Sequence, residues 1–158
     1  MRPGPRCATL PGPRRTQIAT SDRDRSLVIG VDTSVLVRYL VGTPEAQARR
    51  AARLVDGGTE LGVSLVALAE CAHVLRTQYG VSQADILDSL IGLVQRENIS
   101  LLGMRTEILV EQLVRARGLP GRPIPDAIIV ASTVAADALP LATFDRGQRR
   151  YGIAIQEP

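Results

Sequence analysis

Short apolar runs alternate with amphipathic segments through residues 27–158 of the chain. The short runs, such as residues 27–31 and 61–63, are rich in Val, Ile and Leu, which is typical of buried parallel strands. The longer segments between them carry apolar residues at helical spacing and begin at Ser, Thr or Pro, which commonly open helices. This alternation predicts an α/β domain with a short, mainly parallel sheet covered by helices on both faces.

The pattern also predicts where each element lies. Strands are expected at residues 27–31, 61–63, 99–102, 139–142 and 153–155. Helices are expected at residues 34–41, 44–56, 64–79, 82–97, 106–117 and 125–136, with a turn or short helix at 146–150. Glycines that follow several of these helices, such as Gly42 and Gly80, are expected to end them.

Residues 1–26 differ from the rest of the chain. They contain several Pro, six Arg and two Asp, with no apolar periodicity. Such a composition cannot bury a core, so we expect a disordered basic extension before a domain at residues 27–158. Two other interpretations stay open: a basic arm that touches nucleic-acid phosphates, or a segment that precedes the natural start of the protein.

Composition excludes several function classes. All 19 basic residues are Arg, so the chain lacks the Lys that P-loops, Schiff-base enzymes and protein kinases require. The two cysteines, Cys7 and Cys71, cannot form a disulfide framework, which favours a reducing, cytoplasmic setting. No run approaches the ~20 continuous apolar residues of a membrane span, so no membrane association is expected.

Four carboxylates lie in or beside apolar stretches: Asp32, Glu70, Asp126 and Asp145. A buried, unpaired charge is costly, so such groups are usually paired, neutralised or bound to a metal. Two of the four follow predicted strands and two lie near the beginnings of predicted helices. Because ligand sites of open α/β sheets lie beyond the carboxyl ends of the strands, all four are expected to converge there.

Such a cluster suits divalent cations. Mg²⁺ and Mn²⁺ prefer oxygen ligands, and two ions can support hydrolysis of a phosphodiester by activating water and stabilising the leaving oxygen. Close like charges should raise carboxylate pKa values in the metal-free site. Each acid also has a simpler interpretation on its own. Asp32 suits a helix cap, Asp126 a helix N-terminus, Asp145 a turn and Glu70 a solvated surface.

The same acids occur in four segments: VDTSVLV at 31–37, LAECAHVL at 68–75, PDAIIVA at 125–131 and LATFDR at 141–146. Their order and spacing resemble a PIN-domain nuclease, specifically the VapC toxin group of bacterial type II toxin–antitoxin systems. The resemblance covers about residues 27–155 and implies a three-layer PIN-like fold. It implies an Mg²⁺- or Mn²⁺-dependent endoribonuclease that cleaves RNA, a homodimer, and a cognate VapB-like antitoxin.

The resemblance also assigns roles to residues. It implies that metal is held by Asp32, Glu70, Asp126 and Asp145. Supporting hydroxyl groups are expected at Ser34 and Thr143, where they would orient the neighbouring carboxylates or water. Contacts to RNA phosphates are expected from Arg146, Arg149 and Arg150.

Two alternatives remain open at this point. The chain could be a non-catalytic PIN-like module that binds RNA or protein. It could instead be another acid-rich α/β protein, such as a haloacid-dehalogenase-like phosphatase or a receiver domain. The phosphatase pattern wants a second Asp two residues after the first, where this chain has Ser34, and both of these families typically need a Lys.

Overall fold

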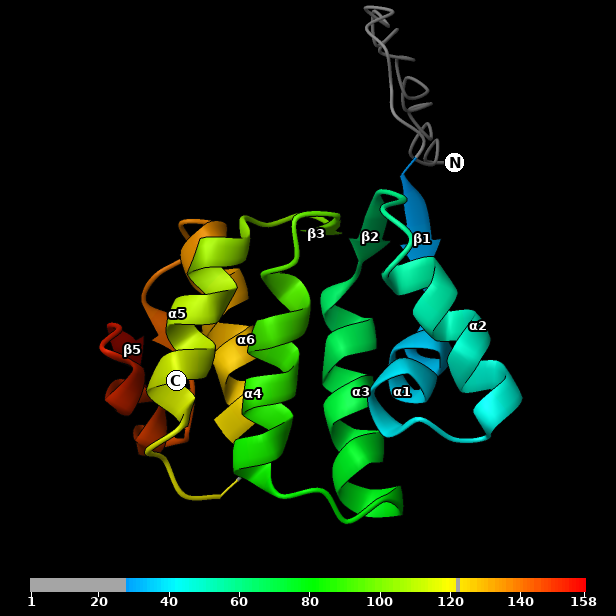
Figure 1. Ribbon diagram of the computed structural model, residues 1–158. Helices are drawn as coiled ribbons and strands as arrows, with labels where there is room; N and C mark the ends of the chain where they lie inside the picture. The colour runs from blue at the N-terminus through cyan, green and yellow to red at the C-terminus, as the bar shows by residue number, and fades with distance from the viewer. Residues whose placement is uncertain (1–27, 122) are drawn as a thin grey trace, which may run out of the picture.

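The computed structural model describes residues 28–121 and 123–158, so the extension predicted at residues 1–26 lies outside the described residues. Three short strands form one parallel sheet in the order β1 (Ile29–Val31), β2 (Leu61–Val63) and β3 (Ile99–Leu101). Helices flank this sheet (Figure 1). The prediction of a mixed α/β fold with a short parallel sheet and flanking helices is confirmed.

The helices follow the predicted segments closely. They are α1 (Thr33–Val41), α2 (Glu45–Val55), α3 (Leu65–Gln78), α4 (Gln83–Val94), α5 (Thr106–Ala116) and α6 (Pro123–Ala135). Ser64 and Ser82 cap α3 and α4 as expected, because each hydroxyl accepts a hydrogen bond from a backbone N–H of the first turn. Helix α6 begins two residues before the predicted start at Pro125. Of the helices that the structure describes, none has the length and apolarity needed to cross a membrane.

The last two strands do not join the first sheet. Strands β4 (Leu141–Ala142) and β5 (Ile155–Gln156) pair with each other in a separate parallel sheet, and a 3-10 helix, η1 (Arg146–Tyr151), connects them. Figure 1 shows β5 and β1 at opposite sides of the molecule. The expectation that all strands join a single sheet was therefore wrong. The physical reason is that α6 packs along α5. Because α6 leads into β4, this packing carries β4 to the side of the molecule where α5 lies.

One face of the first sheet forms part of the core. Leu61 and Val63 are fully buried there, beside apolar side chains of the surrounding helices. On the opposite face Gly30 and Ser100 are exposed. The expected helical cover is therefore present on one face of this sheet and incomplete on the other. The burial of one face is enough to fix the strand register, since a shift of one residue would turn the apolar side chains outward.

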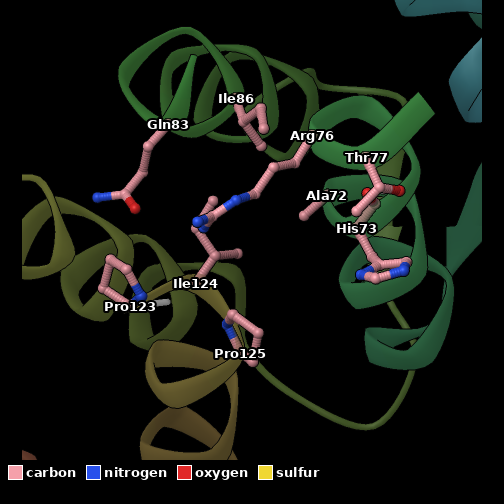
Figure 2. Close-up of a pocket in the computed structure, with 9 residues that line it drawn as sticks. All are labelled: Ala72, His73, Arg76, Thr77, Gln83, Ile86, Pro123, Ile124 and Pro125. Atoms are coloured by element: carbon pink, nitrogen blue, oxygen red, sulfur yellow. The ribbon is translucent and has the colours of Figure 1, made fainter. Parts of the chain in front are cut away.

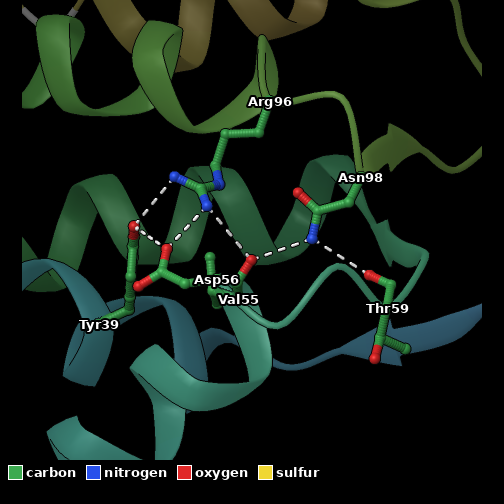
Figure 3. Close-up of polar contacts among 6 residues, drawn as sticks. All are labelled: Tyr39, Val55, Asp56, Thr59, Arg96 and Asn98. Atoms are coloured by element: carbon green, nitrogen blue, oxygen red, sulfur yellow. Dashed lines mark hydrogen bonds and ion pairs between the residues drawn. The ribbon is translucent and has the colours of Figure 1, made fainter.

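A polar network joins the helices next to this sheet (Figure 3). The Arg96 guanidinium donates to the Asp56 carboxylate at 2.7 Å, to the Tyr39 hydroxyl at 3.3 Å and to the Val55 carbonyl at 3.4 Å. Asn98 donates to the same Val55 carbonyl at 2.9 Å. The network therefore connects α1, the end of α2 and the turn before β3, which fixes the end of α1 opposite Asp32.

Candidate functional site

Asp32 directly follows β1 and caps α1. Its Oδ2 accepts hydrogen bonds from the Ser34 hydroxyl at 2.8 Å and from the Ser34 backbone N–H at 3.2 Å. The side-chain bond from Ser34, followed by the backbone bond, lowers the pKa of Asp32, so the carboxyl is held in its charged form. The structure thus gives Ser34 a supporting contact to Asp32, and the carboxylate remains exposed to solvent.

Glu70 lies on α3, which packs against α1. Its Oε2 accepts a hydrogen bond of 2.7 Å from the Thr33 hydroxyl, and Thr33 is buried while Glu70 is exposed. Asp32 and Glu70 line one open pocket of about 240 Å³, with Arg38 and Tyr79 also in its wall. We call these two acids the Asp32–Glu70 pair.

The other two acids form a second pair. Asp126 lies in the first turn of α6, and Asp145 caps η1 through a 2.7 Å hydrogen bond from the Gly147 N–H to its Oδ1. Both line a mainly polar pocket of about 260 Å³, together with Arg150 and Tyr151. A Cβ at position 147 would lie 2.9 Å from Asp145 Oδ1, so a larger residue there would displace the carboxylate from this position.

The environment of this Asp126–Asp145 pair disfavours charge on one member. Burial raises the pKa of Asp126 above its usual value, and the nearby Asp145 carboxylate raises it further, while a hydrogen bond from the Gln148 side chain opposes both effects. Burial and the Asp126 charge also raise the pKa of Tyr151 to about 12. The expected rise in pKa is thus present at Asp126, whereas at Asp32 the pKa falls.

The two pairs do not form one cluster. Within residues 28–121 and 123–158, no group of three or more His, Cys, Asp or Glu side chains is placed to hold one metal ion. The four acids line two pockets, two in each, so their convergence on one site stays a prediction. Strand β4 pairs with β5 and not with the first sheet, and Asp145 follows the end of β4 by three residues.

A small, mainly apolar pocket of about 80 Å³ lies between α3, α4 and the start of α6 (Figure 2). On α3 it includes His73, one turn after Glu70, and on α6 it reaches Pro125, which directly precedes Asp126. Arg76 crosses this region and donates to the Gly121 carbonyl at 3.4 Å. The pocket therefore lies between α3, which carries Glu70, and α6, which carries Asp126.

The remaining predicted residues lie around the Asp126–Asp145 pair. The Thr143 hydroxyl accepts a 3.0 Å hydrogen bond from the Asp145 backbone N–H, so it supports the turn that presents the carboxylate. Arg146 is paired with Glu157 at 3.3 Å. Arg149 and Arg150 are exposed, and of the three arginines Arg150 is the one that lines the pocket of this pair.

Two residues at these sites were not predicted. Thr33 bonds Glu70 across 37 sequence positions, and Gln148 lies beside Asp126 although 22 positions separate them in the printed sequence. Neither has a local pattern that marks it, since both contacts depend on how helices pack. The position of Thr33 directly after Asp32 is the one hint that the sequence offers.

Comparisons with known proteins bear on the family of this chain. Neither the curated proteins nor the solved structures that were compared include a match to the chain. The PIN domain, which is typical of metal-dependent nucleases, matches residues 29–154. These residues include all four acids, strands β1 to β4 and every helix that the structure describes, while β5 begins directly after them. Because that match spans most of the sequence, the chain belongs to the PIN-domain family.

Proposed function

We propose that this protein is a metal-dependent endoribonuclease that hydrolyses RNA phosphodiester bonds as the toxin of a type II toxin–antitoxin system. The observation that carries the proposal is the Asp126–Asp145 pair in one polar pocket of a PIN-domain chain. Burial and, to a smaller extent, the Asp145 carboxylate raise the pKa of Asp126, and a divalent cation bound between the two acids would relieve both effects.

The donor chemistry of both pairs fits Mg²⁺ or Mn²⁺. Each pair offers carboxylate oxygens, and Mg²⁺ usually takes one or two carboxylates and completes its shell with water and substrate phosphate. The Asp32–Glu70 pair would hold one ion and the Asp126–Asp145 pair another. No soft ligand competes in either pair, which disfavours zinc. A bound divalent ion would supply charge neutralisation and an acidified water for attack on phosphorus.

The chain's own residues would prepare this chemistry. Ser34 fixes the direction of the Asp32 carboxylate, and Thr33 fixes that of Glu70. At the other pair, the Gly147 N–H holds Asp145, and the exposed Arg150 guanidinium in the same pocket suits a substrate phosphate. Hydrolysis by water would leave a 5′-phosphate and a 3′-hydroxyl.

The test is cleavage of a labelled RNA pool with Mn²⁺ and with EDTA. We expect cleavage only with Mn²⁺, and a loss of at least about 100-fold in Asp126→Asn, since removal of a charge-stabilising group commonly has this effect. The matched control is Asp137→Asn, which changes an exposed carboxylate outside both pairs, in a left-handed conformation that Asn tolerates. Equal activity of Asp126→Asn and Asp137→Asn would refute the assignment.

A second candidate function is a non-catalytic module that binds RNA or protein. The observation that favours it is that the acids line two pockets and that, among the described residues, no three of them are placed to hold one metal ion. The same experiment distinguishes the two candidates. RNA that shifts in a native gel without any cleavage, with Mn²⁺ present, would support the binding module and exclude the nuclease.

The toxin role is tested by separate experiments. Induced expression of the chain in bacterial cytoplasm should stop growth, and expression of Asp126→Asn should not. Co-expression with a VapB-like antitoxin should restore growth and yield a stable complex. Light scattering should give twice the 16.9 kDa mass of one chain if the protein is a homodimer. If cells that contain active, soluble nuclease grow normally, the toxin role is contradicted while the nuclease activity still stands.

A further inference from the structure

Arg38 lies on α1 and is held in place by neutral groups. Its Nε donates to the Gln47 side-chain oxygen at 2.8 Å, and its Nη1 donates to the Tyr79 hydroxyl at 2.9 Å and to the Thr43 carbonyl at 3.3 Å. None of the ion pairs found among the described residues includes Arg38. The guanidinium is therefore fixed in direction, while its charge has no carboxylate partner in the described part of the chain.

Other arginines of the chain differ in this respect. Arg49, Arg96 and Arg117, for example, each form an ion pair with an Asp or a Glu. A fork of donors that is already ordered and lacks a counter-ion suits an anionic ligand, since little side-chain freedom is lost on binding. The hydrogen bonds alone would also explain a structural link between α1, α2 and α3, so the ligand role depends on where Arg38 lies.

Arg38 lies where two surface pockets adjoin. One is the pocket of about 240 Å³ that includes the Asp32–Glu70 pair, and the other, of about 570 Å³, lies between α1 and α2 and includes Arg50. Ser34 and Arg38 line both pockets, so the two form one open groove across α1, which we call the α1 groove. Figure 1 shows α1 beside α2 and α3, the two helices that supply the rest of its walls.

The charges along the α1 groove change sign from one pocket to the other. The acids Asp32 and Glu70 lie in the first pocket, Arg38 lies where the pockets meet, and Arg50 lies in the second. Like Arg38, Arg50 belongs to none of the ion pairs found among the described residues. A divalent ion on the two acids would attract one phosphate, and the guanidiniums would meet further phosphates of the same strand.

We propose that Arg38 and Arg50 bind backbone phosphates of the RNA strand where it leaves the Asp32–Glu70 pair and crosses α1, an inference that rests on the proposed function. RNA is favoured over an acidic protein segment because a metal-bound phosphate uses the acids of the groove as well as its arginines. Contacts to the backbone add affinity and set the position of the strand, and they carry no preference for particular bases.

The experiment measures how RNA binding depends on salt. A labelled pool of single-stranded RNA is titrated with Mn²⁺ present, in the Asp126→Asn background, where we expect no cleavage. For single strands, each phosphate contact contributes about 0.7 to the slope of log affinity against log salt. Arg38→Gln and Arg50→Gln should each make the slope shallower by about 0.7, which at about 0.1 M salt is a roughly fivefold loss of affinity relative to 1 M.

Arg53→Gln is the matched control. Arg53 is exposed, lies on α2 like Arg50 and lines neither pocket, so the same change of charge should leave the slope unaltered. Arg38→Lys keeps the charge and loses the fork, so its slope should stay near that of the parent while its melting temperature falls as in Arg38→Gln. A purely structural role would lower both melting temperatures and change neither slope.

If Arg38→Gln fails to fold, Arg50→Gln still tests the groove, because no hydrogen bond from the Arg50 side chain is found among the described residues. Slopes of Arg38→Gln and Arg50→Gln that equal the slope of the parent, or an equal change in Arg53→Gln, would overturn the proposal while wild type still cleaves RNA. Unchanged RNA binding with loss of the VapB-like antitoxin complex would overturn it too and identify the groove as a protein-binding surface.

The same measurements distinguish the groove from the proposed function. If wild type does not cleave RNA but the arginine variants show the expected slopes, the phosphate contacts stand and the nuclease assignment fails. If wild type neither binds nor cleaves RNA, the proposed function fails and the phosphate contacts fail with it.

Discussion

The hydrogen bond between Thr33 and Glu70 permits a test that does not depend on activity. Thr33→Val replaces the hydroxyl by a methyl group of nearly the same size and removes the 2.7 Å bond to Glu70 Oε2. Hydrogen bonds to charged groups contribute about 1.5–3 kcal/mol. Glu70 is exposed, so water competes for its carboxylate, and we expect a contribution of only about 1 kcal/mol.

A double-mutant cycle isolates this interaction. The free energy of unfolding is measured in urea for wild type, Thr33→Val, Glu70→Ala and the double variant. The two single changes should be non-additive by about 1 kcal/mol, because each removes the same hydrogen bond. For a chain of this size, 1 kcal/mol corresponds to a shift of about 2–4 °C in melting temperature, which is readily measured.

Thr33→Ser is the control in this cycle, since it keeps the hydroxyl and should retain most of the coupling to Glu70. Additivity of Thr33→Val and Glu70→Ala within about 0.3 kcal/mol would show that the two groups do not interact in solution. In that case α1 and α3 would not hold the Asp32–Glu70 pair as described, and the argument for a prepared metal site at this pair would be refuted.

Three further predictions concern the other pair and the core. Tyr151→Phe should lower the free energy of unfolding by about 1–3 kcal/mol in urea, because the Pro123 carbonyl loses its buried donor; no loss would contradict the 2.6 Å bond. Burial raises the pKa of both Cys71 and Tyr151 from ordinary values of 9.0 and 10.0 to about 12. The unfolded chain therefore releases these protons first, and stability should fall as pH rises from about 9 to 12, unlike the flat profile expected without burial. Asp126→Asn should raise the melting temperature at pH 7 without metal, because the raised pKa shows that charge there opposes folding. The gain should vanish below the ordinary pKa of 3.8, and a lower melting temperature at pH 7 would count against it.

Local elements could be predicted well because their signals are local. A serine before an apolar run predicts a capped helix, and both Ser64 and Ser82 accept the expected backbone hydrogen bonds. The strand at residues 61–63 was predicted with the correct bounds. The alternation of strand and helix was also sufficient for the fold class, since parallel strands require long crossover connections.

Long-range pairing could not be predicted in the same way. The apolar run before Asp145 identifies a strand but does not determine its neighbour, and β4 pairs with β5 over only two residues. The four acids were correctly placed at strand ends and helix starts, yet the structure groups them as two pairs. Gln148 shows a second limit, because a polar residue in an arginine-rich turn gives no sign that it is buried.

The polar network around Arg96 has a consequence for substitution in this lysine-free chain. The planar guanidinium donates hydrogen bonds to a carboxylate, a phenol and a carbonyl that lie in three directions. It also lies 5.9 Å from the centre of the Tyr39 ring. An ammonium carries equal charge but lacks the flat fork of donors that spans such partners. Arg96→Lys preserves the charge and is often regarded as a harmless exchange, but it should therefore weaken the connection between α1 and α2.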